Sequence, residues 1–561
     1  MASEFDFIIV GGGTAGSVLA ARLTENSDVQ VLVVEAGEDL TADPRIKVPT
    51  MWPQLQATDA DWKLKTVPQK ALGNREILIP QGRLLGGSGA LNGMVFAPPA
   101  QEELEAWADL GNPGWDWDGV SKYLKKTYTL TSGAKTEGDG VLQLNIPDEE
   151  TKWPQVWRDT FAGLGFPAGN EPFSGQIHGV VSYPDAVHPV TKTRSFSGNA
   201  YLAPARSRPN LTVWAGVSVD RVLFEQTPDS AIATGVQYTK DAKMQTVTAR
   251  KEVLLCAGTF YSPKILELSG IGDAERLQKL GIDVVVDNPY VGENLQNHPL
   301  CSITFEVGGD DDEAEGFETI DAIARQDPTA LGAAMEAYKT EQRGPFSQTN
   351  FNVTAHIPFP GIATDDGKQD LDQILEKHTG TTTTNVPGSK TTREYATAHQ
   401  SLIRSVLNSP TGASGYYTHF PGWAYFGPTV LHHRRDAEVL ARHVRFLESS
   451  LAAAPPLAGR LKHRRQEVAA PSGWPRGFSG HLDEARRFVR ETAIGAMHVT
   501  GTCSMMPREK GGVVDPRLRV YGTRNLRVVD ASIMPFTTRA NTMATVYGIA
   551  EKAADMIRAG L

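Results

Sequence analysis

Residues 5–37 read FDFIIVGGGTAGSVLAARLTENSDVQVLVVEAG. The runs 5–10 and 29–34 are short, apolar and rich in β-branched residues, which predicts two buried strands. Residues 17–23 between them have the composition of a helix. The stretch therefore predicts a β-α-β unit in which a glycine-rich loop joins the first strand to the helix.

The glycine-rich loop has the spacing of a dinucleotide-binding site. Gly11, Gly13 and Gly16 form G-x-G-x-x-G, in which the glycines allow a tight turn, a close approach to pyrophosphate and helix–strand packing. Glu35 stands at the end of the second strand, 19 residues after Gly16, where an acidic side chain can bind the adenosine ribose. These features in register favour a dinucleotide site over a structural glycine turn, although FAD and NAD share the fingerprint.

The composition narrows the class of protein. The chain has 561 residues, too many for one ordinary domain, and 40% of them are apolar, which suffices for a large core. Its 55 Lys and Arg residues against 65 Asp and Glu give a net charge of -10, the wrong sign for a nucleic-acid-binding protein. No apolar run is long enough to span a membrane, and the first residues lack a secretory signal pattern, which predicts a cytoplasmic protein.

The three cysteines carry no metal or disulfide pattern. Cys256, Cys301 and Cys503 are odd in number and widely spaced, which excludes a disulfide framework and a CxxC site. No metal site is therefore predicted.

Further motifs follow along the chain. They are QGRLLGGSGALNGMV (81–95), GTFYSPKILELSGIG (258–272), VGENLQNHP (291–299), HVTGTCSMM (498–506), LRVVDAS (526–532) and NTMATVY (541–547). Together with the glycine loop, and in this order, they resemble the glucose-methanol-choline (GMC) oxidoreductase family from about residue 5 to the end of the chain.

The resemblance implies a mixed α/β fold, α+β overall, with two interleaved domains. A Rossmann-like FAD-binding domain of discontinuous segments would be covered by a substrate domain built on an antiparallel sheet flanked by helices. We assign residues 1–155, 201–300 and 486–561 to the FAD-binding domain, the last segment also carrying the active site, and residues 156–200 and 301–485 to the substrate domain. Near 420–435 the chain is shorter than most relatives, which would open the pocket or expose a sheet edge.

The resemblance also implies which residues bind FAD. The pyrophosphate and ribose would be held by Gly11, Gly13, Thr14, Ala15, Glu35 and Ala36, with Trp62 near the adenosine and Val219 touching adenine through its backbone. The flavin and phosphates would be lined by Arg83, Gly87, Ser88, Asn92, Gly93 and Val95, and closed from the C-terminal side by Asp530, Ala531, Asn541 and Thr542. Segment 81–95 lacks the histidine or cysteine that carries covalent flavin in some relatives, so noncovalent FAD is favoured.

Two residues match the family's catalytic positions. His498 matches the active-site histidine, whose neutral ring is suited to remove a hydroxyl proton, and Asn541 matches the second position, where an amide can donate a hydrogen bond to the developing alkoxide. The alternatives are a satisfied core histidine and a helix-capping asparagine. His298, in Asn297-His298-Pro299, is interpreted as structural.

These residues predict an FAD-dependent oxidoreductase that converts a primary or aryl alcohol to the carbonyl by hydride transfer to flavin N5. Its partners would be a small alcohol and either oxygen or another electron acceptor, and the sequence gives no oligomeric state. The shortened segment motivates an alternative, a redox-silent lyase or cyclase that keeps FAD structurally. A degenerate FAD-binding scaffold ranks below both.

Overall fold

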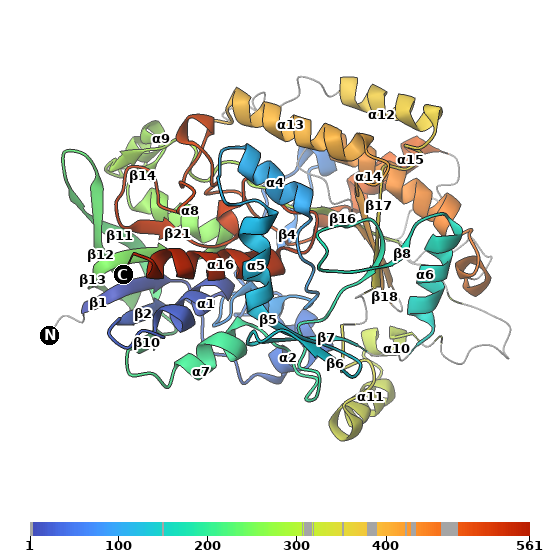
Figure 1. The fold of residues 1–561 in the computed structure, drawn as a ribbon, viewed down its shortest axis with the longest axis horizontal. Helices are drawn as coiled ribbons and strands as arrows, with labels where there is room; N and C mark the ends of the chain where they lie inside the picture. The colour runs from blue at the N-terminus through green and yellow to red at the C-terminus, as the bar shows by residue number, and fades with distance from the viewer. Residues whose placement is uncertain are drawn as a thin grey trace.

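The computed structural model describes residues 4–147, 151–303, 319–349, 353–377, 390–420, 423–427, 434–461 and 481–560, with 305, 307 and 317. The chain forms two large sheets, and Figure 1 labels strands of both. They are called the first and the second sheet below.

The first sheet is built around the predicted β-α-β unit. Its strands, in spatial order, are β10 (Leu211–Trp214), β2 (Val31–Val34), β1 (Glu4–Val10), β13 (Lys243–Leu255), β12 (Ala231–Lys240) and β11 (Ser218–Gln226), and β21 (Leu526–Val528) also pairs with β13. Strands β10, β2, β1, β13 and β21 run parallel, and β13, β12 and β11 form an antiparallel meander. All residues of β2 are buried, which explains its continuous apolar run.

Three helices cover this sheet. Helix α1 (Thr14–Leu23) packs on β1 and β2, and α16 (Thr542–Arg558) lies between α1 and α5 (Trp117–Thr127) (Figure 1). Arg22 of α1 pairs with the fully buried Glu551 of α16 at 2.8 Å. Asp116 caps α5 by accepting a hydrogen bond from Gly119 N at 2.7 Å. The contacts between α1 and α16 join the first and last segments of the chain in one core.

The second sheet forms the other half of the molecule. Its order is β20 (Ile494–Gly495), β16 (Pro299–Ile303), β19 (Trp423–Gly427), β18 (Gly415–Phe420), β17 (Val353–Ile357), β9 (Gly179–Ser182) and β8 (Ala168–Asn170), and every neighbouring pair except β8 and β9 is antiparallel. Helices α6 (Trp153–Gly163), α14 (Arg434–Phe446) and α15 (Leu482–Thr492) share a core with one face of it. A smaller sheet of β6 (Lys135–Glu137), β5 (Tyr128–Ser132) and β7 (Leu142–Ile146) pairs with neither of them, and its buried apolar residues belong to the core of the first sheet.

The predicted fold class is confirmed: a mostly parallel sheet from discontinuous segments accompanies an antiparallel sheet flanked by helices. The exact domain boundaries stay a prediction. Around the shortened region, β18 and β19 pair along their whole length and β19 pairs with β16, so the described strands leave no open edge there. Among the described residues, no helix is both long and apolar enough to cross a bilayer.

Candidate active site

A cavity of about 780 Å³ lies between the carboxyl ends of the first sheet and the open face of the second sheet. Val10 and Val34, the last residues of β1 and β2, line it, at the edge where parallel α/β sheets bind ligands. On the other side, Tyr416 and Thr418 of β18 line the cavity, whereas Tyr417 between them packs into the helical core. The alternation of the pleat thus gives one face of the second sheet to the core and the other to the cavity.

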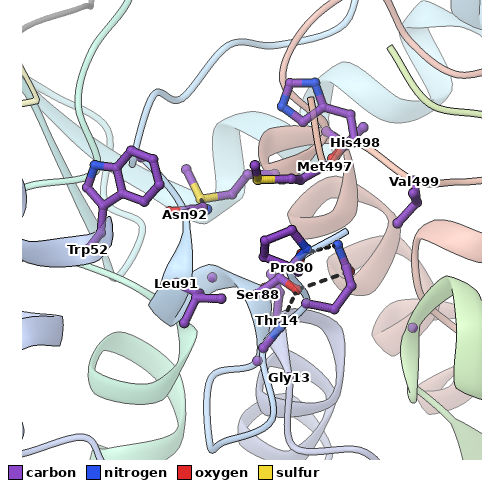
Figure 2. A pocket seen from close by; sticks show the side chains of 18 of the residues that line it. Gly13, Thr14, Trp52, Pro80, Ser88, Leu91, Asn92, Met497, His498 and Val499 are labelled. Atoms are coloured by element: carbon purple, nitrogen blue, oxygen red, sulfur yellow. Dashed lines mark hydrogen bonds between the residues drawn. The ribbon is translucent and has the colours of Figure 1, made fainter. Parts of the chain in front are cut away.

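The cavity collects nearly all of the predicted site residues. The predicted residues that line it are Gly11, Gly13, Thr14, Ala15, Glu35, Ala36, Trp62, Gly87, Ser88, Asn92, Gly93, Val95, Val219, His498, Asp530, Ala531, Asn541 and Thr542. Figure 2 shows Gly13, Thr14 and Ser88 toward one end and Met497 and His498 toward the other.

Arg83 is the predicted residue that does not line the cavity. Its guanidinium carbon lies 5.1 Å from the ring centre of Trp62, which in turn stacks on Tyr261 with ring centres 3.9 Å apart. The structure therefore places Arg83 behind Trp62.

The glycine loop is shaped for a close approach of phosphate. Gly11 has φ +103°, and a Cβ there would lie 2.4 Å from the carbonyl oxygen of Cys256. At Gly13 the nearest atom to a Cβ would be the Cα of Gly87, 3.7 Å away, so the side of Gly13 that lacks a side chain faces open space. Helix α1 starts there with no side-chain cap and no acidic residue in its first turn, which leaves its amide groups available to an anion.

Glu35 ties the loop to the second strand. Its two carboxylate oxygens accept from Gly12 N and Gly37 N, each at 2.8 Å. Burial raises the pKa of Glu35 to about 7. The two backbone hydrogen bonds act in the opposite direction, because they favour the carboxylate. Its position at the end of β2 suits the ribose of a dinucleotide.

The second glycine segment and the C-terminal segment complete this end of the cavity. A Cβ at Gly87, which has φ +54°, would lie 2.7 Å from the Cα of Gly13, so the two loops touch through their backbones. Asp530 accepts from Gly258 N at 2.9 Å and from Ser262 Oγ at 2.6 Å, and burial raises its pKa. These uncapped amides, side-chain-free backbones and the acid at β2 fit the pyrophosphate and ribose of FAD.

His498 and Asn541 meet at the opposite end. Asn541 Nδ2 lies 3.2 Å from His498 Nε2, and Tyr416 donates its hydroxyl to Asn541 Oδ1 at 3.3 Å. Asn541 is the N-terminal flanking residue of α16, yet its side chain makes no capping hydrogen bond. The capping alternative therefore does not account for this side chain, which is directed to His498 instead.

The protein around His498 disfavours its charged form. The ring is exposed only in part and lines the cavity, and desolvation lowers the pKa of His498 to about 4. Its backbone N donates to Asn297 Oδ1 at 2.9 Å. At neutral pH the site thus holds an uncharged imidazole that can accept a proton.

Sequence reasoning missed several residues that line the cavity. His298, interpreted as structural, lines the cavity with its Nδ1 2.9 Å from His498 Nδ1. The apolar wall was also missed: Met51, Trp52, Leu300, Ile320, Ile323, Leu331, Phe346 and Met497. Trp52 lies in η1 (Pro49–Leu55), and Ile323 and Leu331 lie in α10 (Asp321–Ala324) and α11 (Pro328–Glu341). The pattern Asn297-His298-Pro299 was visible in the sequence, but no local signal marks the wall.

The described ranges hold no group of three or more His, Cys, Asp or Glu side chains arranged for a metal ion. The three cysteines are free and buried, and burial raises the pKa of the Cys301 thiol to about 12. One end of the cavity, formed by the glycine loop, Glu35, Gly87 and Asp530, is shaped for a dinucleotide and is called the cradle below. The same cavity holds a neutral base, His498, and a hydrogen-bond donor, Asn541.

The chain is similar to known oxidoreductases over nearly its whole length. Profiles of GMC oxidoreductases match residues 5–300 with their N-terminal part and residues 424–550 with their C-terminal part. Dehydrogenase mpl7 of Monascus purpureus is 32% identical over 622 aligned residues, which cover 99% of this chain and 96% of that protein. An oxygen-dependent choline dehydrogenase of Cronobacter sakazakii is 33% identical over 584 residues, covering 99% of this chain and 95% of the other.

Solved structures share the whole fold. An FAD-dependent oxidoreductase from Chaetomium thermophilum superposes with a TM-score of 0.87 at 26% identity and covers 99% of both chains. A fungal aryl-alcohol oxidase gives a TM-score of 0.84 at 26% identity and covers both chains completely.

Proposed function

Since the chain belongs to the GMC oxidoreductase family and uses FAD, we propose that it oxidises a bulky apolar primary alcohol, of the aryl type, to the aldehyde. The observation that carries this proposal is a neutral histidine facing an amide donor in the same cavity as the dinucleotide cradle. FAD, when bound, supplies the oxidant that accepts the hydride at N5.

The residues of this chain would act on the proton and on the position of the alcohol. His498 Nε2 would take the hydroxyl proton as the carbon–hydrogen bond breaks, because an alkoxide releases hydride far more readily than an alcohol. Asn541 Nδ2, 3.2 Å from that nitrogen, would donate to the developing alkoxide without competing for the proton. The glycine loop and Glu35 would hold the cofactor noncovalently through backbone amides and one carboxylate.

The chemistry of the wall supports the substrate class. Trp52, Phe346 and Met497 line the cavity, together with aliphatic side chains of α10 and α11, and Met497 lies beside His498 (Figure 2). The carboxylates among the described lining residues are Glu35 and Asp530, and both lie at the cradle end, where backbone amides occupy them. A cationic alcohol such as choline would therefore find no ion pair at the wall, whereas a benzyl or longer alkyl alcohol would bury its apolar part.

The test is anaerobic mixing of the FAD-loaded protein with benzyl-type, long-chain, short-chain, polyol and choline substrates, followed at the flavin absorption band. We expect bleaching by the aryl or long-chain alcohols and at least about tenfold slower bleaching by choline, because a buried unpaired charge is costly. Failure of every alcohol to bleach a fully loaded sample would refute the oxidation, and faster bleaching by choline would refute the substrate class. The rate at which air re-oxidises the reduced flavin, compared with the rate for an added dye, would then show whether oxygen or another compound is the electron acceptor.

No observation favours the redox-silent alternative. Its motive was the shortened segment near 420–435, of which residues 421–422 and 428–433 lie outside the described ranges. Among the described residues, β16, β19, β18 and β17 pair as neighbours in that spatial order. The cytoplasmic location remains a prediction from the sequence.

A further inference from the structure

His298 lies against the proposed base. Its Nδ1 is 2.9 Å from His498 Nδ1, and the two rings cross at 83° with centres 5.1 Å apart. His298 is 5% exposed and lines the cavity. The contact is therefore a part-buried hydrogen bond between two imidazoles at the reactive end of the site.

The backbone holds both rings in this arrangement. Strands β16 and β20 pair Pro299 with Gly495, and the carbonyl of His298 accepts from Ala496 N at 2.8 Å. In the other direction, Asn297 Oδ1 accepts from His498 N at 2.9 Å. Because the segments 297–299 and 495–498 are fastened at several points, the ring contact is a product of the strand pairing.

The proton positions follow from counting donors and acceptors. A neutral imidazole has one donor nitrogen and one acceptor nitrogen. Tyr416 donates to Asn541 Oδ1, which turns the amide so that its Nδ2 donates toward His498 Nε2. With Nε2 accepting, Nδ1 of His498 carries the hydrogen, and the atom facing it, Nδ1 of His298, is the acceptor.

We propose that His298 is a positioning residue: it holds His498 in the tautomer with hydrogen on Nδ1, and so presents an unprotonated Nε2 to the alcohol. The inference rests on the proposed function and deepens it. When the hydroxyl proton moves to Nε2, His498 becomes an imidazolium whose Nδ1 hydrogen stays in place, and the hydrogen bond to His298 strengthens because its donor is now charged. His298 itself gains no proton in this step.

Two substitutions separate this role from a packing role. In His298→Asn the amide oxygen stands near the former Nδ1 and still accepts, whereas His298→Leu fills similar space without an acceptor. We expect flavin reduction, measured by stopped flow on FAD-loaded protein and expressed per bound FAD, to stay within about threefold for His298→Asn and to fall by about tenfold or more for His298→Leu. The apparent affinity for the alcohol should change little in either variant.

His443→Leu is a matched control. His443 is also buried, at 2% exposed, but it contacts Ser414 Oγ at 3.0 Å and Tyr417 Oη at 2.7 Å, in the helical core. Its loss should leave the reduction rate of loaded protein within about threefold, because no proton of the reaction is held there. If His298→Leu does not load FAD, His298→Ala is assayed with added imidazole, which should restore the rate in a concentration-dependent way.

The proposal is overturned if His298→Leu reduces the flavin as fast as the parent protein, if His298→Asn and His298→Leu are equally slow, or if imidazole restores nothing. A measurement independent of turnover is ¹⁵N NMR of histidine-labelled resting protein with FAD, with the His498 signal assigned by its loss in His498→Gln. The expected signature is a protonated Nδ1 and an unprotonated Nε2, and the opposite tautomer would refute the role. If the parent protein is bleached by no alcohol, the proposed function fails alone, and the NMR result still decides the tautomer.

Discussion

At the residue scale, the side chains of His498 and Asn541 meet across 43 positions of sequence. Each had a structural alternative, a satisfied core histidine for His498 and a helix cap for Asn541. The amide of Asn541 makes no capping hydrogen bond, and His498, although both of its ring nitrogens contact polar groups, is part-exposed and lines the cavity. Polar side chains that contact each other at the wall of a cavity are typical of a reactive site, and this contact makes the base assignment testable.

Replacing His498 by Ala should slow flavin reduction by the best alcohol by about 100-fold or more, because the hydroxyl proton loses its acceptor. FAD content should stay at the parent level, since the cradle lies at the other end of the cavity. Anaerobic stopped flow with the absorbance ratio of flavin to protein measures both. A loss below about threefold would remove His498 from the role of base.

The pH dependence of the same reaction follows from the pKa of His498. The base must be neutral, and desolvation lowers its pKa to about 4, so the working form dominates at every pH above that value. We expect the reduction rate to be level from about pH 8 to about pH 5.5 and to fall about tenfold per unit below the pKa. A midpoint near 6.5, the usual histidine value, would show instead that the ring is solvated during the reaction.

At the element scale, the turn from β1 into α1 creates the anion site. The three glycines of this turn are of two kinds. Gly11 and Gly16 are required by the fold itself, because a Cβ would lie 2.4 Å from the carbonyl oxygen of Cys256 and 2.0 Å from that of Gly11. Gly13 has φ -74° and no close neighbour, so the fold alone would accept a side chain there.

The pair Gly13→Ala and Gly16→Ala tests this division. Gly13→Ala should keep the fold and weaken FAD binding by about tenfold or more, because its methyl group enters the space of the pyrophosphate. Gly16→Ala should lower the yield of folded protein, since the backbone of the turn must move. Titration of FAD into stripped protein and circular dichroism of both variants give the two readouts. Full FAD affinity in Gly13→Ala would place the pyrophosphate elsewhere.

At the scale of the whole molecule, the cavity is assembled from many parts of the chain. Its walls come from both large sheets, from the loops after β1 and β2, from α10 and α11, and from the start of α16. A ligand in this position contacts all of these segments at once. FAD binding should therefore stabilise the tertiary structure as a whole.

Removing FAD should lower the midpoint of thermal unfolding, and adding it back should restore the midpoint in proportion to the logarithm of its concentration. A free concentration of 100 times the dissociation constant corresponds to about 2.7 kcal/mol of added stability. Differential scanning fluorimetry of stripped and reloaded protein makes the comparison, with AMP as a control that occupies only the adenosine part. Equal midpoints with and without FAD would mean that the cradle forms no part of the stabilising core.

His498 and Asn541 were predicted from the resemblance of their motifs to the family. The sequence by itself determined the β-α-β unit and the placement of Glu35 at the end of its second strand. These depend on short-range features: periodicity fixes a strand or a helix, and spacing fixes which residue ends a strand. Only the tertiary structure decided that Arg83 lies behind Trp62, that Tyr416 orients Asn541, and that helices α10 and α11 supply the apolar wall.

The contact of His298 with His498 is also decided only by the tertiary structure. It joins residues 200 positions apart, and it arises because β16 and β20 pair in one register. A shift of one residue would turn the opposite face of the strand to the cavity. Local sequence sets the elements, but strand register and packing between distant segments decide which side chains converge, and those are properties of the folded chain.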